Sequence, residues 1–210
     1  MTNHFDKVAE QYDTEERQHK EAQRSFEYIT KYIPIKKHFH VLDIGCGTGI
    51  LTLKVAEKVK ALLAVDNSQG MLDILNKKIK QKNVKNIQTL HHDIVENNLP
   101  FRDFNLVFST KTMHHIEKID EFLKYIYSIL DNEGYVCIID LLPEDGTFHS
   151  EMHDGIKHFG FEKDFIRKTI ERAGFKNISV DKIYDIKKER NNKIVKYPLF
   201  IAVGQKIINK

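Results

Sequence analysis

One stretch constrains the fold more than any other: a short apolar run that ends in three glycines at alternate positions. Residues 39–44 read as a strand, Gly45, Gly47 and Gly49 follow, and residues 50–56 have the pattern of a helix. Glycine adopts positive φ without strain and has no Cβ to hold a ligand away from the backbone. The helix that follows presents unpaired backbone N–H groups and the positive end of its dipole to the turn. This arrangement is typical of a nucleotide-type cofactor site in an open α/β sheet.

The glycine turn departs from a dinucleotide fingerprint. That fingerprint reads G-x-G-x-x-G, and Ile50 stands where its third glycine would be. Asp43 lies two residues before the first glycine, where a carboxylate would repel a pyrophosphate but could receive a cationic amine. Asp66 ends the next apolar run, residues 61–66, and is placed to accept hydrogen bonds from two ribose hydroxyls.

The pattern D-x-G-x-G-x-G, followed by an acid at the end of the second strand, closely resembles that of the class I S-adenosylmethionine-dependent methyltransferases. The resemblance covers roughly residues 35–207. It implies a Rossmann-like, doubly wound seven-stranded sheet, mostly parallel with an antiparallel edge hairpin. The strand–helix alternation after Phe39 separately predicts a parallel sheet covered on both faces. The resemblance also implies S-adenosylmethionine as cofactor and methyl transfer (EC 2.1.1) to a small-molecule acceptor.

The same resemblance implies how a cofactor would be held. Asp43 would orient the methionyl ammonium, and Asp66 would accept from the ribose diol. Met71 would flank the adenine, while Asp93 would accept from the adenine amino group with Ile94 beside the ring. The full set of expected cofactor-binding residues is Tyr12, Asp43, Gly45, Cys46, Gly47, Gly49, Asp66, Asn67, Met71, Asp93, Ile94 and Ser109.

Residues 1–34 are predicted to form an N-terminal helical lid on a methyltransferase domain of residues 35–210. The spacing of Phe5, Val8 and Tyr12 places them on one helix face. The same stretch resembles the F-D-x-x-A-x-x-Y-D lead-in of small-molecule methyltransferases, whose helix closes over the cofactor and brings its tyrosine to the amino-acid end. The alternative is an amphipathic helix that packs these side chains into the core.

Two adjacent histidines follow the fourth predicted strand, residues 104–109. The stretch 109–116 resembles the family segment that passes under the transferable methyl group. His114 and His115 could act as general bases, since imidazole titrates near neutral pH. They could also cap the helix predicted over residues 116–130 or shape the substrate pocket. A positional role is favoured, and His115 is the candidate catalytic residue.

Three more histidines lie in a predicted polar loop, residues 141–160. His149 and His153 are four residues apart, a spacing that can hold a metal ion on one helix face. With His158 they have no acidic partner at a familiar metal-ligand spacing. Metal binding, substrate contact and a solvated loop all remain open, and no metal site is predicted. The chain then ends in two β runs, residues 176–186 and 194–207, expected as an antiparallel edge hairpin around a solvated basic segment.

Composition narrows the function classes. The 210 residues include 33 basic and 30 acidic side chains, a net charge of +3 that gives little support to nucleic-acid binding. Residues 109–112 read Ser-Thr-Lys-Thr, without the N/D-P-P-Y/F motif of base-methylating enzymes. Apolar runs are too short to span a membrane, so a cytoplasmic location is the default. Cys46 and Cys137 are expected to be reduced and structural.

Two other function classes stay open. One is an NAD-dependent oxidoreductase on a similar sheet, and the other is a non-catalytic S-adenosylmethionine-binding protein. The acceptor and the oligomeric state, including a possible homodimer, are not determined by the sequence.

Overall fold

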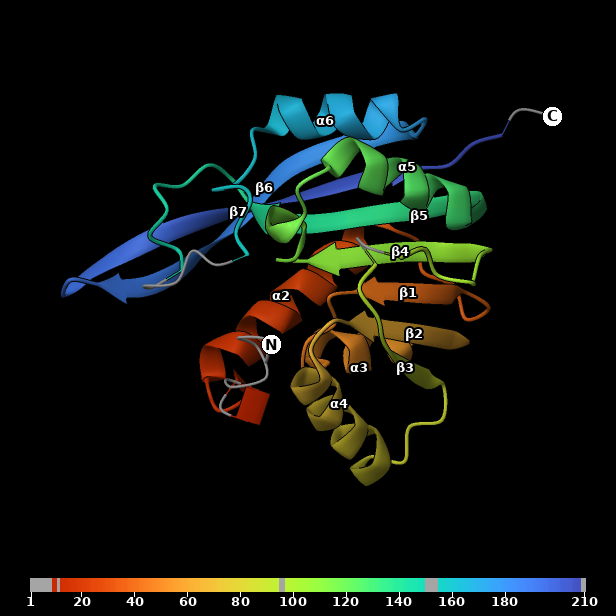
Figure 1. The fold of residues 1–210 in the computed structure, drawn as a ribbon, viewed down its shortest axis with the longest axis horizontal. Coiled ribbons are helices and arrows are strands. Elements are labelled where there is room, and N and C mark those ends of the chain that lie inside the picture. The colour runs from red at the N-terminus through yellow and green to blue at the C-terminus, as the bar shows by residue number, and fades with distance from the viewer. Residues whose placement is uncertain (1–8, 11, 95–96, 150–154, 209–210) are drawn as a thin grey trace.

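The computed structural model describes residues 9–10, 12–94, 97–149 and 155–208, in which helices cover both faces of a seven-stranded sheet (Figure 1). The strands are β1 (His40–Ile44), β2 (Ala61–Asp66), β3 (Ile87–His91), β4 (Phe104–Thr110), β5 (Leu130–Leu141), β6 (Lys176–Arg190) and β7 (Lys193–Gln205). Their order is β3-β2-β1-β4-β5-β7-β6. Strands β1 to β5 pair in parallel, and β7 is antiparallel to both β5 and β6. The predicted fold class, with its antiparallel edge hairpin, is confirmed.

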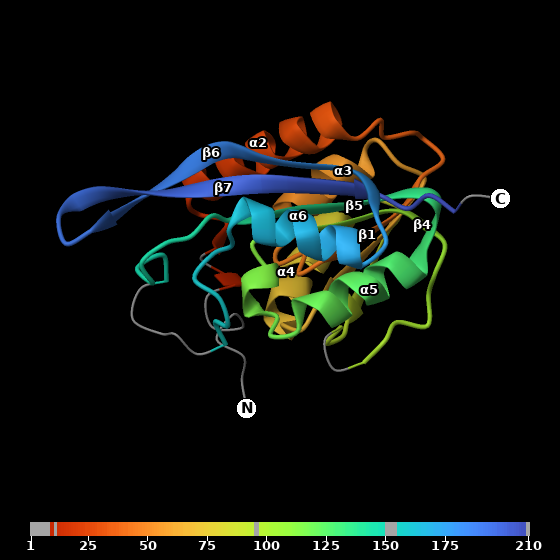
Figure 2. The same ribbon diagram turned by 90° about the horizontal axis from the view of Figure 1, so that it is seen from above.

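The helices are α2 (Glu16–Tyr32), α3 (Ile50–Ala56), α4 (Gln69–Gln81), α5 (Ile119–Ile129) and α6 (Lys163–Arg172), with a 3-10 turn η1 (Met113–His115). Seen from above, α2 and α3 lie on one side of the sheet and α5 and α6 on the other (Figure 2). No helix in the described ranges is both long and apolar enough to cross a bilayer.

Two apolar cores form because successive strand residues point to opposite faces of the sheet. In β1, Val41 packs with Ile29 of α2 on one face. Its neighbour Leu42 packs with Leu123 of α5 on the other face. All four side chains are fully buried, and this double coverage accounts for the near-continuous apolar runs of the central strands.

The second N-terminal helix is attached to the edge hairpin. The Ser25 hydroxyl is 3.0 Å from the hydroxyl of Tyr184 in β6, and the Tyr28 hydroxyl donates to the carbonyl of Ile183 at 3.0 Å. Of the first predicted helix, Ala9, Glu10 and Tyr12 are helical. Phe5 and Val8 lie outside the described residues, so the predicted apolar face is not tested.

Two predicted boundaries were wrong. Helix α5 begins at Ile119 rather than at residue 116, because the histidine segment forms the turn η1 and Ile116 is extended, with φ −95° and ψ 120°. Strands β6 and β7 continue through the basic segment to a turn at Asn191 and Asn192, whose φ values are 49° and 59°. Two adjacent positive φ values are typical of a type I′ hairpin turn, which asparagine tolerates. The long hairpin projects beyond the rest of the sheet (Figure 2).

Candidate functional site

The glycine loop is braced on one side and open on the other. Gly45, Gly47 and Gly49 have φ values of 70°, 54° and 78°, and the Gly45 amide donates to the Val65 carbonyl at 2.8 Å. A Cβ on Gly45 would come within 2.2 Å of the Thr112 hydroxyl, whereas a Cβ on Gly47 would meet nothing within 4 Å. The loop therefore offers its open side at Gly47, where a ligand can approach the backbone.

Two buried carboxylates flank this loop. Asp66 accepts hydrogen bonds from the amides of Gly47 at 2.7 Å and Ser68 at 2.9 Å. Asp43 accepts from the Thr52 hydroxyl at 2.6 Å. Burial, followed by the charge of Asp66, raises the pKa of Asp43 to about 7. Burial also raises the pKa of Asp66 in spite of its backbone hydrogen bonds. A pair of buried acids at a helix N-terminus fits a ligand with a cationic group and hydroxyl donors.

The ends of β2 and β3 bring the expected adenine-binding residues together. The Asn67 side-chain amide lies 3.4 Å from the Asp93 carboxylate. Ile94, the residue after Asp93, is buried. Met71, in the first turn of α4, is buried as well. The Ser68 hydroxyl accepts from the Met71 amide at 3.2 Å, so Ser68 caps this helix.

Two more of the expected residues, Ser109 and Cys46, serve the architecture in this structure. The Ser109 hydroxyl donates to the Ile44 carbonyl at 3.0 Å and so joins β4 to β1 just before the glycine loop. The Cys46 thiol lies 3.6 Å from the Gly47 carbonyl, and burial raises its pKa. A buried thiol with a raised pKa is unreactive.

Asp13 contacts the glycine loop, a role that sequence reasoning missed. Its carboxylate accepts from the Thr48 hydroxyl at 2.5 Å and forms an ion pair with Lys78 of α4. Lys78 also donates to the Thr48 carbonyl at 2.7 Å. The segment that precedes α2 is thus held on the loop. The available signal was the final aspartate of the Y-D pair in the N-terminal pattern.

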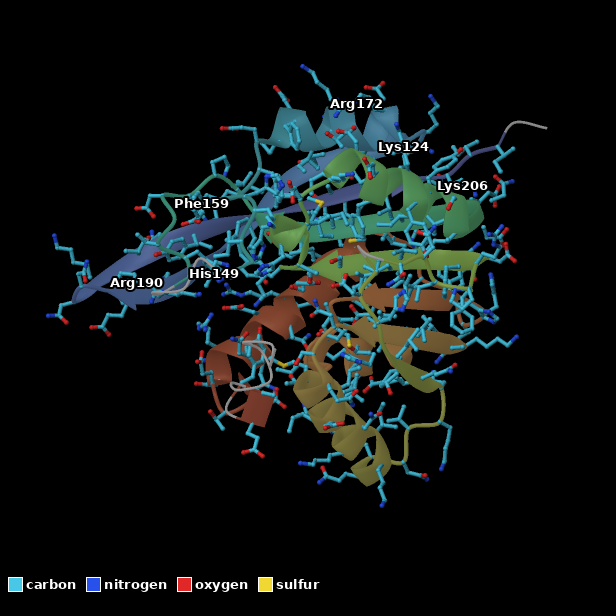
Figure 3. The ribbon with its side chains drawn as sticks, viewed as in Figure 1. Lys124, His149, Phe159, Arg172, Arg190 and Lys206 are labelled. Atoms are coloured by element: carbon cyan, nitrogen blue, oxygen red, sulfur yellow. The ribbon has the colours of Figure 1, made fainter. Side chains whose placement is uncertain are left out.

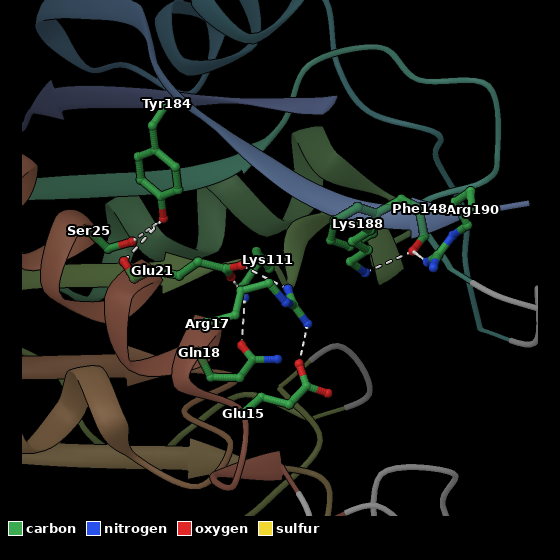
Figure 4. A network of polar contacts seen from close by, with 10 residues as sticks. All are labelled: Glu15, Arg17, Gln18, Glu21, Ser25, Lys111, Phe148, Tyr184, Lys188 and Arg190. Atoms are coloured by element: carbon green, nitrogen blue, oxygen red, sulfur yellow. Dashed lines mark hydrogen bonds and ion pairs between the residues drawn. The ribbon is translucent and has the colours of Figure 1, made fainter. Parts of the chain in front are cut away.

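A largely buried lysine joins the end of β4 to α2 (Figure 4). The Lys111 ammonium is 2.8 Å from Glu21 and 3.4 Å from the Gln18 side-chain oxygen, and Arg17 also pairs with Glu21 at 2.8 Å. Burial alone would lower the pKa of Lys111, but Tyr12 and Glu21 outweigh it and raise this pKa. Tyr12 therefore lies within electrostatic range of Lys111, at the carboxyl end of the central strands.

Three histidines converge beside this point. His114 is buried, and its Nδ1 lies 2.8 Å from Asp140 Oδ1 while its Nε2 lies 3.1 Å from Nε2 of His149. Nδ1 of His115 lies 2.9 Å from the Gly155 carbonyl. One ring nitrogen from each of the three histidines lies within 4.8 Å of the others. The structure thus brings the two histidines after β4 to His149 of the predicted polar loop.

The other two loop histidines are placed differently. Nε2 of His158 lies 2.9 Å from the Ile116 carbonyl, which ties it to the segment after η1. His153 lies outside the described residues.

Two of the three histidines are uncharged near neutral pH. Burial, with His114 next, lowers the pKa of His115 to about 4. Burial and the two neighbouring histidines lower that of His149 to about 3. A base with a pKa so far below 7 is a weak proton acceptor in the transition state. The lowered pKa of His115 therefore favours a positioning or ligand role for this residue over general-base catalysis.

The basic hairpin is less solvated than the sequence suggests. Lys188 donates to the Phe148 carbonyl at 2.8 Å and lies over its ring, and Arg190 donates to the same carbonyl at 2.8 Å. Figure 4 shows Lys188 and Arg190 at the Phe148 carbonyl, and Figure 3 labels Arg190 and His149 at the same end of the molecule. Burial, with Arg17 and Lys111 adding to it, lowers the pKa of Lys188 to about 7. The hairpin fixes this connection because its long side chains reach back over the sheet edge.

A family model and several relatives of known sequence describe methyltransferases. The model of a methyltransferase domain matches residues 41–134. The chain is 26% identical over 159 residues to an uncharacterized methyltransferase of Schizosaccharomyces pombe, covering 69% of this chain and 56% of that protein. It is 27% identical over 183 residues to a demethylmenaquinone methyltransferase of Lactobacillus johnsonii, covering 73% and 74%. The chain therefore spans little more than half the length of the first of these relatives.

The fold also matches a solved structure along nearly its whole length. A chain from the complex between the Haloferax volcanii Trm112 methyltransferase activator and a methyltransferase superposes with a TM-score of 0.79. The match covers 99% of this chain and 100% of that one at 16% sequence identity. At this identity the likeness concerns the fold.

Proposed function

Because the chain belongs to the class I S-adenosylmethionine-dependent methyltransferases, we propose that it transfers the sulfonium methyl group of S-adenosylmethionine to a small-molecule acceptor. The observation that carries the proposal is the glycine loop, open at Gly47, between the buried carboxylates of Asp43 and Asp66. The demethylmenaquinone methyltransferase among its relatives supports a small-molecule acceptor.

The residues present fit this cofactor. Asp43 lacks a cationic partner among the groups that shift its pKa, so the methionyl ammonium would supply one. Asp66 retains acceptor capacity for the ribose hydroxyls beside its two backbone bonds. Asn67 and Asp93 would reach the adenine edge, with Met71 and Ile94 against its faces.

When bound, S-adenosylmethionine supplies an electrophilic methyl carbon, and the chain supplies orientation and exclusion of water. The segment around Tyr12 and Asp13 would cover the amino-acid end of the cofactor, because Asp13 holds it to the glycine loop. This assigns the lid function to residues before α2, while α2 itself is fixed to β6 through Ser25 and Tyr184.

Isothermal titration of S-adenosylhomocysteine into the wild type and Asp66→Ala tests the proposal. The variant should lose about 1–3 kcal/mol of binding free energy, the cost of removing the partner of buried hydroxyls. Asp73→Ala is the matched control, because Asp73 is an exposed acid of α4 that bonds Gln69. A wild type that does not bind S-adenosylhomocysteine would contradict the proposal.

Two further measurements separate the alternatives. An NAD-dependent oxidoreductase would bind NADH in the same titration, and we expect no heat from it. A non-catalytic protein would bind S-adenosylhomocysteine yet show no turnover with any class of hydroxyl, amine, thiol or carbon acceptor. We expect turnover with at least one of these classes.

A further inference from the structure

We propose that His114, His115 and His149 bind one divalent transition-metal ion of the zinc type. We further infer that this ion holds a protic acceptor, an alcohol or a thiol, in its open coordination position. The second statement rests on the proposed methyltransferase function, whereas the first does not. Neutral imidazoles are the nitrogen ligands that zinc and its first-row neighbours prefer.

The hydrogen bonds fix which nitrogen of two rings could bind a metal. Asp140 Oδ1 and the Gly155 carbonyl only accept hydrogen bonds, so Nδ1 of His114 and Nδ1 of His115 carry the ring protons. The lone pair of each ring therefore belongs to Nε2. A metal-bound histidine usually donates its other ring N–H to a carboxylate or carbonyl in this manner.

Asp140 would not bind the ion itself but accepts the hydrogen bond from Nδ1 of the ligand His114. It is fully buried, and its Oδ1 and Oδ2 also receive the amides of Leu141 at 2.7 Å and His114 at 3.3 Å. An ionised carboxylate on Nδ1 raises the basicity of Nε2 toward a metal ion.

The distances suit one shared ion. Two ligands at the usual 2.0–2.1 Å from a tetrahedral zinc are about 3.3 Å apart, and the Nε2 atoms of His114 and His149 are 3.1 Å apart. One ring nitrogen from each histidine lies within 4.8 Å of the others, so tetrahedral binding requires the widest pair to approach by up to about 1.5 Å. Because Nε2 of His114 carries a lone pair, Nε2 of His149 donates the hydrogen bond between them. On metal binding the ring proton of His149 would therefore have to move to its Nδ1. Lys188 and Arg190 hold its neighbour Phe148 in place.

The proposed ion would lie beside the cofactor loop. Thr112, two residues before His114, packs against Gly45 so closely that a Cβ there would clash with it. Three protein ligands leave the fourth position of a tetrahedral ion for water or substrate, the pattern of catalytic zinc sites. Asp140 contacts Nδ1 of His114 on the outside of the cluster, so the set of direct donors is three imidazoles.

Such an ion would activate the acceptor by lowering the pKa of its O–H or S–H group. The proton would leave to solvent, and the lone pair of the oxygen or sulfur would form the new bond to the methyl carbon. The bond from that carbon to the sulfonium sulfur would break, and its electron pair would stay on the sulfur as a neutral thioether. Charge and atoms balance without an oxidant or reductant.

Titration of Co²⁺ into the full-length, chelator-treated and tag-free chain tests the site. Wild type should take up one Co²⁺ with the visible absorption of a tetrahedral ion, and Zn²⁺ should displace it. His115→Ala and His149→Ala should each weaken binding at least tenfold. His149 lies on a connection rather than in the sheet, so His149→Ala is the variant expected to keep its fold, as circular dichroism would verify. His40→Ala, an exposed histidine at the start of β1, is the control.

Asp140→Asn separates a metal site from a packing cluster. It should lower Co²⁺ affinity about 10–100-fold, the usual effect of losing an outer partner, and leave S-adenosylhomocysteine affinity unchanged. No uptake by the wild type, or equal uptake by His149→Ala, would overturn the metal site. Uptake of Co²⁺ by a protein that does not bind S-adenosylhomocysteine would support the metal site. The same result would overturn both the acceptor role of the ion and the proposed methyltransferase function. Once an acceptor is known, turnover that survives removal of the ion would overturn the acceptor role alone.

Discussion

Asp43 is a buried acid whose ionisation should be coupled to cofactor binding. Its pKa is raised to about 7, with burial as the main cause and Asp66 as a second. In the ligand-free protein the folded state holds this proton up to about pH 7, whereas an unfolded chain releases it near pH 4. The contribution of Asp43 to stability is therefore present at low pH and is lost as the pH rises from about 4 to about 7.

Affinity for S-adenosylhomocysteine should rise between pH 5.5 and pH 7.0, because the ligand ammonium favours ionised Asp43. The expected gain is up to about tenfold per pH unit. Titration calorimetry in buffers of different ionisation heat should also detect proton release on binding. Asp43→Asn should flatten the pH dependence, and an equally steep slope in this variant would assign it to another group.

Gly47→Ala should separate ligand approach from loop strain. Both Gly47 and Gly45 have positive φ, so alanine costs about 1–2 kcal/mol at either position. At Gly45 the new Cβ would also strike Thr112 at 2.2 Å. Gly47→Ala should thus lose cofactor affinity with a small fall in melting temperature, and Gly45→Ala should lose more stability. Unchanged binding by Gly47→Ala would contradict a cofactor path over this residue.

At the scale of elements, Asp13 attaches the segment before α2 to the glycine loop and to α4. The Asp13 carboxylate and Lys78 are each about four-fifths buried, with side-chain exposures of 21% and 18%. Their interaction therefore escapes much of the solvent screening that weakens surface ion pairs. Loss of the Asp13 carboxylate would remove both of these attachments of the segment to the loop and to α4.

Asp13→Ala and Lys78→Met should each accelerate dissociation of S-adenosylhomocysteine several-fold, measured by stopped-flow or surface plasmon resonance. The double variant should be less impaired than the sum of the single variants, with a coupling of about 0.5–3 kcal/mol. Lys80→Met is the control, since Lys80 is an exposed lysine near the end of the same helix. Additive effects would show that the pair does not hold the segment.

At the scale of the whole molecule, Lys111 and Glu21 connect the N-terminal helix to the sheet. The positive φ of Lys111, 56°, turns the chain after β4 toward α2. Burial would raise the pKa of Glu21, but Lys111 and Arg17 reverse the effect and lower it. Glu21 is thus a charged and buried acid. Its ionised form is stabilised in the fold by Lys111 and Arg17.

Lys111→Met should destabilise the protein by about 3 kcal/mol, because it leaves buried Glu21 with Arg17 alone. Glu21→Gln combined with Lys111→Met should recover part of this loss, because it removes the unpaired charge. Denaturant unfolding at pH 7 measures both. A double variant less stable than Lys111→Met would mean that Glu21 stabilises the fold without its lysine.

Much of the fold could be read from local patterns. The strand, glycine turn and helix around Gly45 depend on neighbours in the chain, since positive φ and apolar periodicity are local properties. Helix α3 and strand β2 have the bounds that their patterns predict. The patterns failed where tertiary contacts override local preference. Helix α5 starts late because His114 turns toward Asp140, and β6 extends because its backbone pairs with β7.

By itself the sequence determined the sheet class, from its strand–helix alternation, and it placed the glycine loop and the acids at the ends of β1 and β2 within residues 39–66. Only the tertiary structure decided which distant side chains meet. Asp13 meets Lys78, Glu21 meets Lys111, and His114 meets both Asp140 and His149. These pairs follow from parallel strand register, which brings the carboxyl ends of β4 and β5 together, and from the packing of α2 on the sheet. Register and packing are non-local, so spacing along the chain could not reveal them.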